Sequence, residues 1–190
     1  DMTLASNATI NVDADEVDHM LADETAGRLT IVDQNIIVSG AITVDQANFL
    51  TATTSGTVTA TINTTEIVSE LATLSADGGD NVLTIAIRVE DATACTASQL
   101  NNINNATSLA VNINNVTALV SSSLSDLGTL ATAISDGGFS NATGLTTIAV
   151  SDTTIDATIL ATRIDSYDTI NGDAKTTDMT LVSGATINVD

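Results

Sequence analysis

Short runs along the chain alternate β-branched or apolar residues with small polar residues, and this period of two is typical of β-strands. The runs are residues 8–12, 41–44, 58–62, 83–89, 109–113, 147–150 and 185–189, with a weaker one at 130–134. We expect their apolar side chains to form the core: Ile10, Val12, Ile42, Val44, Ile85, Ile87, Val111, Ile113, Ile148 and Val150. The pattern therefore predicts many short strands.

Between these runs the apolar residues change to helical spacing. Ile67, Leu71 and Leu74 lie on one face of a helix predicted over residues 64–74, and Thr96 begins a Thr-x-x-Gln capping box. Further helices are predicted over residues 13–21, 96–103 and 154–164. Because a strand that is followed by a helix and then another strand cannot close a tight hairpin, we expect parallel strand pairing.

One segment of the chain occurs twice. Residues 1–13 return as residues 178–190 with only two differences, Ala5 to Val182 and Asn7 to Gly184. The sequence thus predicts one repeat period over residues 1–177 and the start of the next over residues 178–190.

Parallel strands in a periodic chain predict a β-rich repeat protein. The expected fold is a parallel β-solenoid, or a βα-solenoid with short helices, of about 7 to 8 coils per period. An open α/β sheet of the Rossmann type fits the same alternation of strands and helices and remains the alternative.

The charge balance excludes several classes of partner. The chain has 24 Asp and Glu against 4 Lys and Arg, a net charge of −20, so it lacks the basic surface that a nucleic-acid backbone requires. No apolar run approaches the roughly 20 residues of a membrane span, and we expect no membrane insertion. Self-repulsion at this charge favours a saline medium or one that supplies Ca²⁺.

Several Asp-rich turns place carboxylate and carbonyl oxygens at the short spacing that Ca²⁺ requires, although Asp, Asn and Gly are also the ordinary residues of turns. The candidate ligands are Asp13, Asp15, Asp77, Asp80, Asp136 and Asp173. None of these turns matches an EF-hand loop. We expect no other cofactor.

Nucleophilic catalysis has little support in this chain. His19 is the single histidine and Cys95 the single cysteine, and their spacing does not suggest a catalytic pair. We interpret His19 as a solvated helix residue, and Cys95 as a buried apolar residue or a link between subunits. The protein is therefore not expected to be an enzyme.

The phrases at residues 96–113 and 145–152 resemble the acidic Thr/Ala/Asp-rich repeats of large secreted or cell-surface bacterial proteins, which include adhesins, S-layer-like proteins and surface filaments. The resemblance is one of style over most of the chain, and it implies an extracellular or cell-surface location and self-assembly. The function we expect is a structural filament or surface fibre whose repeats or subunits stack on one another. The alternative is the stalk or ligand-binding module of a bacterial adhesin.

Overall fold

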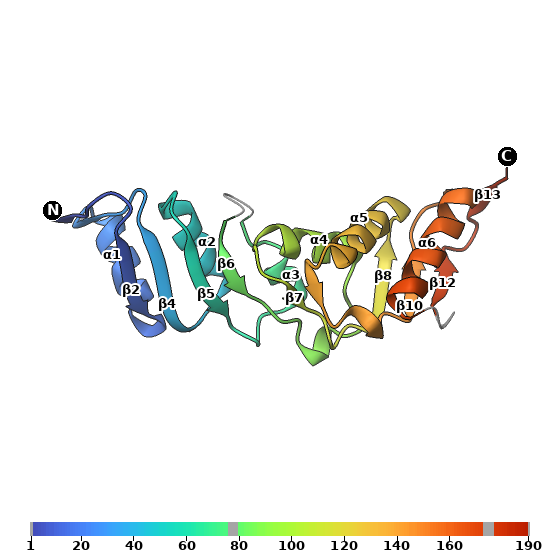
Figure 1. The fold of residues 1–190 in the computed structure, drawn as a ribbon, viewed down its shortest axis with the longest axis horizontal. Helices are drawn as coiled ribbons and strands as arrows, with labels where there is room; N and C mark the ends of the chain where they lie inside the picture. Colours follow the sequence, from blue (N-terminus) through green and yellow to red (C-terminus); the bar gives the residue numbers. More distant parts are fainter. Residues whose placement is uncertain (1, 76–79, 173–176, 190) are drawn as a thin grey trace.

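The computed structural model describes residues 2–75, 80–172 and 177–189. The molecule is elongated, and its helices and strands follow one another along the long axis from the N-terminal to the C-terminal end (Figure 1). The described residues form six α-helices: α1 (Val17–Thr25), α2 (Val44–Thr53), α3 (Val68–Leu71), α4 (Ala97–Asn105), α5 (Leu124–Ser135) and α6 (Ala157–Ile170). Three 3₁₀ turns lie at Ala14–Glu16, Val89–Asp91 and Ala142–Gly144.

The strands form five short sheets within the described residues, and their pairing is parallel throughout. The largest sheet contains β2 (Thr9–Asp13), β4 (Asn35–Ile42), β5 (Val58–Ile62) and β6 (Val82–Thr84). The second contains β8 (Ala118–Ser122), β10 (Thr147–Val150) and β12 (Asp178–Leu181). The others pair β1 (Met2–Thr3) with β3 (Leu29–Thr30), β7 (Val111–Asn112) with β9 (Phe139–Ser140), and β11 (Thr154–Asp156) with β13 (Thr186–Asn188).

The register of the sheets explains the elongated shape. Ile10 pairs with Ile36, and Ile36 with Val58; further along, Ile148 pairs with Met179. Paired strand residues therefore lie 20 to 32 residues apart in the chain. Because pairing always joins segments that are close in sequence, the chain advances along one axis.

The predicted parallel β-solenoid, with or without short helices, is wrong. The structure is a mixed α/β fold of several short parallel sheets and six helices in the described residues. The sheets are interrupted: after β6, regular pairing gives way to an isolated bridge between Ala86 and Asn112. The strands also do not form the single open sheet of the Rossmann alternative. The physical reason is that Leu/Ala/Thr-rich stretches fold as full helices, which leaves only two to eight residues for each strand.

The local predictions had mixed outcomes. The strands predicted at 58–62 and 147–150 match β5 and β10, whereas the weak strand at 130–134 lies inside α5 and is wrong. The run at 41–44 is divided, because β4 ends at Ile42 and Thr43 caps α2. Thr96 does cap α4: its hydroxyl accepts the Gln99 N–H, and the Gln99 side chain accepts the Thr96 N–H.

The apolar core runs through the molecule between the strands and helices. Of the ten residues expected in it, eight are buried: Ile42, Val44, Ile85, Ile87, Val111, Ile113, Ile148 and Val150. Ile10 and Val12 are half-buried against the core, because β2 is an end strand with one neighbour in its sheet. The helices add Leu50, Leu100 and Leu127, and α6 contributes Tyr167, the largest fully buried side chain.

Candidate assembly interface

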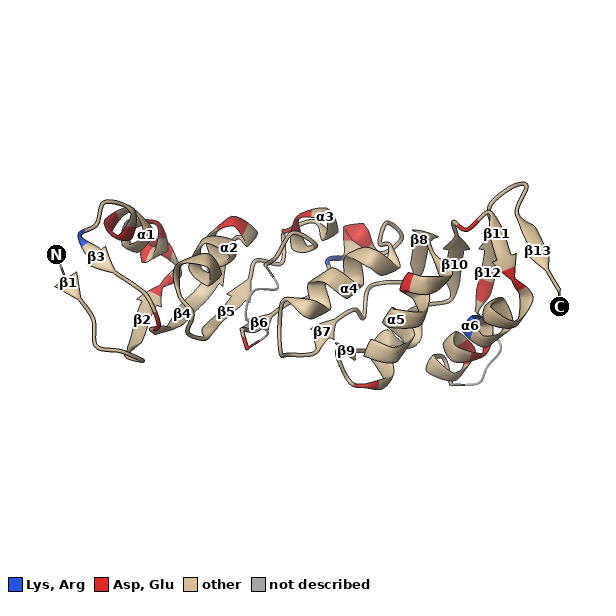
Figure 2. Cartoon of the chain, turned by 90° about the horizontal axis from the view of Figure 1, so that it is seen from above, with Lys and Arg blue, Asp and Glu red and all other residues tan. Residues whose placement is uncertain are grey.

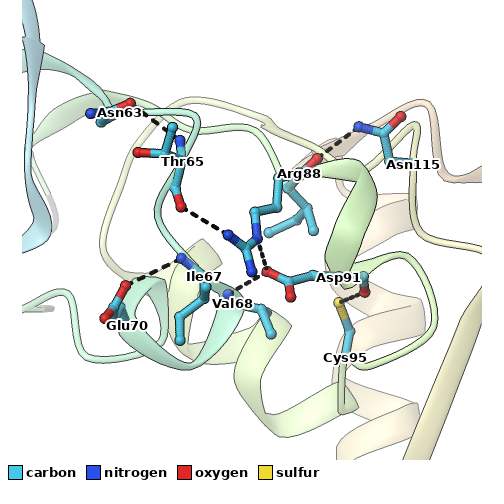
Figure 3. Close-up of polar contacts among 10 residues, drawn as sticks. Asn63, Thr65, Ile67, Val68, Glu70, Arg88, Asp91, Cys95 and Asn115 are labelled. Atoms are coloured by element: carbon cyan, nitrogen blue, oxygen red, sulfur yellow. Dashed lines mark hydrogen bonds and ion pairs between the residues drawn. The ribbon is translucent and has the colours of Figure 1, made fainter.

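A polar cluster surrounds the ion pair of Arg88 and Asp91, which lies between α3 and α4 in the chain (Figure 3). The Asp91 carboxylate accepts a hydrogen bond from Arg88 Nε at 3.0 Å and one from the Val68 N–H at 2.8 Å. Arg88 also donates to the Thr65 carbonyl at 3.1 Å. The Arg88 and Asp91 side chains are only 27% and 10% exposed, and their bonds tie the loop before α3 to the segment before α4. The cluster is thus a structural joint between neighbouring segments.

The Asp91 contact belongs to a series. In each case, an oxygen of a later segment accepts the first backbone N–H of an earlier helix, a donor that the helix itself leaves without a partner. Glu66 accepts from Val44 at the start of α2. Asp91 accepts from Val68 of α3, Ser122 from Ala97 of α4 at 2.9 Å, and Asp152 from Leu124 of α5 at 2.8 Å. Three of these four acceptors are carboxylates, so part of the acidic composition has a structural role that the sequence pattern did not reveal.

The Glu66 carboxylate has an unfavourable electrostatic environment. Burial is the largest cause that raises its pKa, followed by a hydrogen bond and charge repulsion from Glu70. The hydrogen bond from the Val44 N–H lowers the pKa of Glu66, but it does not outweigh these causes.

Cys95 and His19 do not form a catalytic pair. Cys95 is fully buried before α4, and its thiol donates to the Asp91 carbonyl at 3.3 Å. Burial, with the nearby Asp91 charge, raises the pKa of Cys95 to about 12, which keeps the thiol protonated and unreactive. His19 lies exposed on α1, near the N-terminal end.

The expected calcium ligands are not brought together. Asp13, Asp15, Asp80 and Asp136 are exposed and lie on separate segments, except for the neighbours Asp13 and Asp15. Asp13 accepts a hydrogen bond from the Ser39 hydroxyl, and Asp136 follows the end of α5. Asp77 and Asp173 lie outside the described residues. Within residues 2–75, 80–172 and 177–189 there is no group of three or more His, Cys, Asp or Glu side chains that could hold a metal ion.

Figure 2 shows acidic residues along the whole length of the molecule, many of them near the helix starts, with few basic residues between them. The described residues form two ion pairs, Arg28 with Asp23 and Arg88 with Asp91. Most of the 24 acidic residues therefore lack a basic partner among the 4 available. At low ionic strength, the negative charges of these acidic side chains repel one another.

A surface hollow lies along α5, bounded by Asn104 of α4 and Arg163 of α6. Its volume is about 720 Å³, and its described lining residues include one carboxylate, Asp136, and one cation, Arg163. Arg163 donates to the Leu124 carbonyl at 3.0 Å and so already holds a structural bond. The paired carboxylates needed for glycoside hydrolysis are not among these lining residues.

The two ends of the molecule carry the two copies of the repeated segment. Residues 1–13 contain β1 and β2 at the N-terminal end, and residues 178–190 contain β12 and β13 at the C-terminal end (Figure 1). The turn between the strands has the same left-handed conformation in both copies, with φ of 55° at Asn7 and 83° at Gly184. The substitution at this position is therefore compatible with one shared backbone shape, because glycine adopts positive φ readily.

The two copies of the repeated segment form their backbone hydrogen bonds through opposite strand edges. At the N-terminal end, the Met2 N–H donates to the Arg28 carbonyl, and the Ala8 carbonyl accepts from the Asn35 N–H, both at 2.9 Å. These bonds join the segment to the residues that follow it.

At the C-terminal end, the Asp178 N–H donates to the Thr146 carbonyl at 2.7 Å, and the Thr186 N–H donates to the Thr153 carbonyl at 2.9 Å. These bonds join the segment to the residues that precede it. Successive residues of a parallel strand direct their backbone groups to opposite sides. In the N-terminal copy Ala8 bonds to the residues that follow the segment, whereas in the C-terminal copy Thr186, the equivalent of the next residue Thr9, bonds to the residues that precede it. Among the described residues, the two copies therefore pair through opposite strand edges.

Apolar side chains are also left uncovered at both ends. At the C-terminal end, Ile187 is 46% and Val189 82% exposed, whereas Ile36, one strand inside the N-terminal end, is 0% exposed. At the N-terminal end, a hollow of about 480 Å³ is lined mainly by apolar side chains of the first strands and α1: Met2, Leu4, Ile10, Val12, Met20 and Leu29. The ends therefore combine free strand edges with exposed apolar surface, which is typical of a surface that another strand covers.

Comparison with known proteins adds no relative: no protein-family model, no curated protein and no solved structure matches this chain. Among the described residues, no helix has both the length and the apolar character needed to cross a membrane.

Proposed function

We propose that this protein is a structural protein that forms an extracellular filament or surface fibre by end-to-end stacking of its 177-residue units. The observation that carries the proposal is the opposite bonding of the repeated segment at the two ends. One copy of the segment can pair with residues 147–156 on one side and with residues 29–39 on the other. A unit that follows another in the chain then continues the strand pairing without a break.

The energetics of the ends support stacking. An internal position of a strand column, such as Ile36 between Ile10 and Val58, is fully buried, while the equivalent column at the C-terminal end stops at the half-exposed Ile187. A following unit would cover Ile187 and Val189 and would satisfy the free backbone groups of β12 and β13. Burial of apolar surface and pairing of backbone groups both favour this contact.

The charge supports a role in assembly rather than in binding to nucleic acid. A net charge of −20 spread along an elongated surface keeps neighbouring fibres apart while leaving the ends, where apolar residues gather, free to associate. The resemblance to repeats of large secreted bacterial proteins supports a location outside the cell for such a fibre.

The test is electron microscopy of a chain that holds two periods in tandem, imaged with Ca²⁺ and with a chelator. We expect a rod about twice as long as the single unit, without a gap at the junction. The matched control carries Asp in place of the residues that correspond to Ile187 and Val189 at the junction, and it should bend or separate there. Two particles joined by a flexible linker in the unmodified chain would contradict the proposal and would favour the adhesin stalk.

A further inference from the structure

The repeated segment has a consequence for separate copies of the chain, and this consequence rests on the proposed function. We propose that, when residues 1–190 are present as separate copies, residues 178–190 of one copy compete with residues 1–13 of a second copy for the docking site on that second copy. The partner is a second copy of the unit. The contact surfaces are residues 29–39 at one end and residues 147–156 at the other.

The competition follows from the register. At the N-terminal end, Ile10 lies opposite Ile36 and Thr9 opposite Asn35. In the C-terminal copy, Ile187 corresponds to Ile10 and lies opposite Ile155 on its own β11, so its other edge is free to meet a second Ile36. That Ile36, however, is already covered by Ile10 of its own chain. Two separate chains can therefore join only if one of the two copies of the segment leaves its site.

The exchange is almost balanced in energy. The strand pairs that a departing copy loses are replaced by the same pairs with the incoming copy, because the two sequences differ only at positions 5 and 7 and their equivalents. The resident copy has the advantage of being tethered, with an effective concentration of about 1 mM for a short flexible connection. Against about 10 μM of separate chains, this favours the resident copy by roughly 100-fold. A chain of two periods escapes this competition, since its junction contains a single copy of the segment.

Weakening one resident copy should therefore release assembly. In Ile10→Asp, a charge lies against the buried Ile36, so the pairing of residues 1–13 with β4 is destabilised. The edge of β4 can then pair with residues 178–190 of another chain. Ile187→Asp is the matched variant at the other end, where Ile155 is fully buried. It frees the edge of β11 for residues 1–13 of another chain. The double variant Ile10→Asp/Ile187→Asp has no intact copy and serves as the control.

The experiment is sedimentation velocity of the four full chains at about 10 μM. At this concentration, binding of the tethered copy is expected to be favoured over binding of a separate chain by roughly 100-fold. We expect a monomer for the original chain, concentration-dependent oligomers for each single variant, and a monomer for the double variant. A synthetic peptide of residues 178–190 should shorten the oligomers of Ile10→Asp, and the same peptide with Asp at the position of Ile187 should not. Single variants that remain monomeric, or a double variant that assembles as far as the single ones, would overturn the proposal.

Protection of the buried Cys95 thiol from modification reports that each variant is folded. A second measurement does not depend on weakening either copy. A chain with Thr9→Cys is mixed with a chain with Thr154→Cys under oxidising conditions, because Thr186, the equivalent of Thr9, lies opposite Thr154. A disulfide between the two chains is expected to accumulate, and a mixture with Thr129→Cys on α5 should form none. If the two-period chain forms a continuous rod but neither measurement detects joining of separate chains, the stacking proposal is supported and the exchange proposal is wrong. If the two-period chain forms separate particles, both proposals are wrong.

Discussion

The ion pair of Arg88 and Asp91 allows a sharp test of how the segments are held together. Asp91→Ala removes two hydrogen bonds to a charged carboxylate, from the Val68 N–H and from Arg88 Nε. Hydrogen bonds to charged groups contribute about 1.5 to 3 kcal/mol each. The Val68 N–H is left without its acceptor at a buried residue, whereas Arg88 is 27% exposed and keeps its bond to Thr65, so it can be partly hydrated. We therefore expect a loss of about 3 to 4 kcal/mol, near the lower end for breaking a buried ion pair.

The assay is urea unfolding followed by circular dichroism, together with thermal unfolding. For a chain of this size, the expected loss corresponds to a fall in Tm of roughly 10 °C. Asp91→Asn should lose about half as much, because its amide oxygen can still accept the Val68 N–H while only the charge on Arg88 is left unmatched. Asp15→Ala is the control, since Asp15 is exposed, and it should change stability by less than about 0.5 kcal/mol.

A double-mutant cycle with Arg88→Met separates the two bonds of the carboxylate. If Asp91→Ala loses as little as Asp15→Ala, the carboxylate does not join the two segments. If it still loses about 3 kcal/mol in the Arg88→Met background, the ion pair contributes little and the helix cap accounts for the effect.

Three further predictions use groups at other places in the fold. Glu66→Gln should stabilise the protein at pH 7, because the pKa of Glu66 is raised by burial and by Glu70, so its ionised form is unfavourable in the folded state. The difference from the original chain should vanish as the pH falls below the ordinary pKa of a glutamate, where both side chains are neutral; a constant difference in Tm from pH 3 to 8 would contradict this cause. The Cys95 thiol should react with a thiol reagent only on unfolding, as followed by absorbance with and without urea, and rapid reaction of the native chain would place Cys95 at the surface. Tyr167→Phe should lose about 1 kcal/mol in urea unfolding, because the buried hydroxyl donates to the Leu127 carbonyl at 3.1 Å, and an unchanged midpoint would show that this bond adds nothing to the packing of α6 on α5.

The strand predictions from the sequence were most accurate where the alternation of apolar and polar residues fitted a strand and did not also fit a helix. Residues 58–62 and 147–150 alternate apolar and polar residues between turn residues, and both are strands of those bounds. It failed at 130–134, where Leu130, Ala131 and Ile134 also fit the spacing of a helix that begins earlier, at Leu124. A run of five residues cannot distinguish the two periods, and the N-cap at Ser123 that would have decided for the helix lies outside it. The capping box at Thr96 succeeded because both of its partners are local.

The helix predicted at 64–74 shows a second limit. Its regular part is only α3, Val68–Leu71, because the carboxylate of Asp91 caps the chain at Val68. That acceptor comes 23 residues later, so no local pattern could place the start of this helix. The same applies to the candidate interface. The repeated segment is visible in the sequence, but which edge each copy uses depends on the backbone bonds of Met2, Ala8, Asp178 and Thr186.

The helix caps and the strand pairing both join each segment of the molecule to the segment that follows it in the chain. The helices α2, α3, α4 and α5 each receive an oxygen from a segment that comes later in the chain, through Glu66, Asp91, Ser122 and Asp152. Each segment thus completes the one before it. At the C-terminal end, α6 and β13 are poorly buried beside the well-buried α4. Stacking of a following unit would supply a later neighbour there, so we infer that the C-terminal end gains more order from assembly than the N-terminal end does. Hydrogen exchange of the single unit and of the two-period chain would measure this difference: protection of α6 should rise at the junction, while protection of α1 should change less.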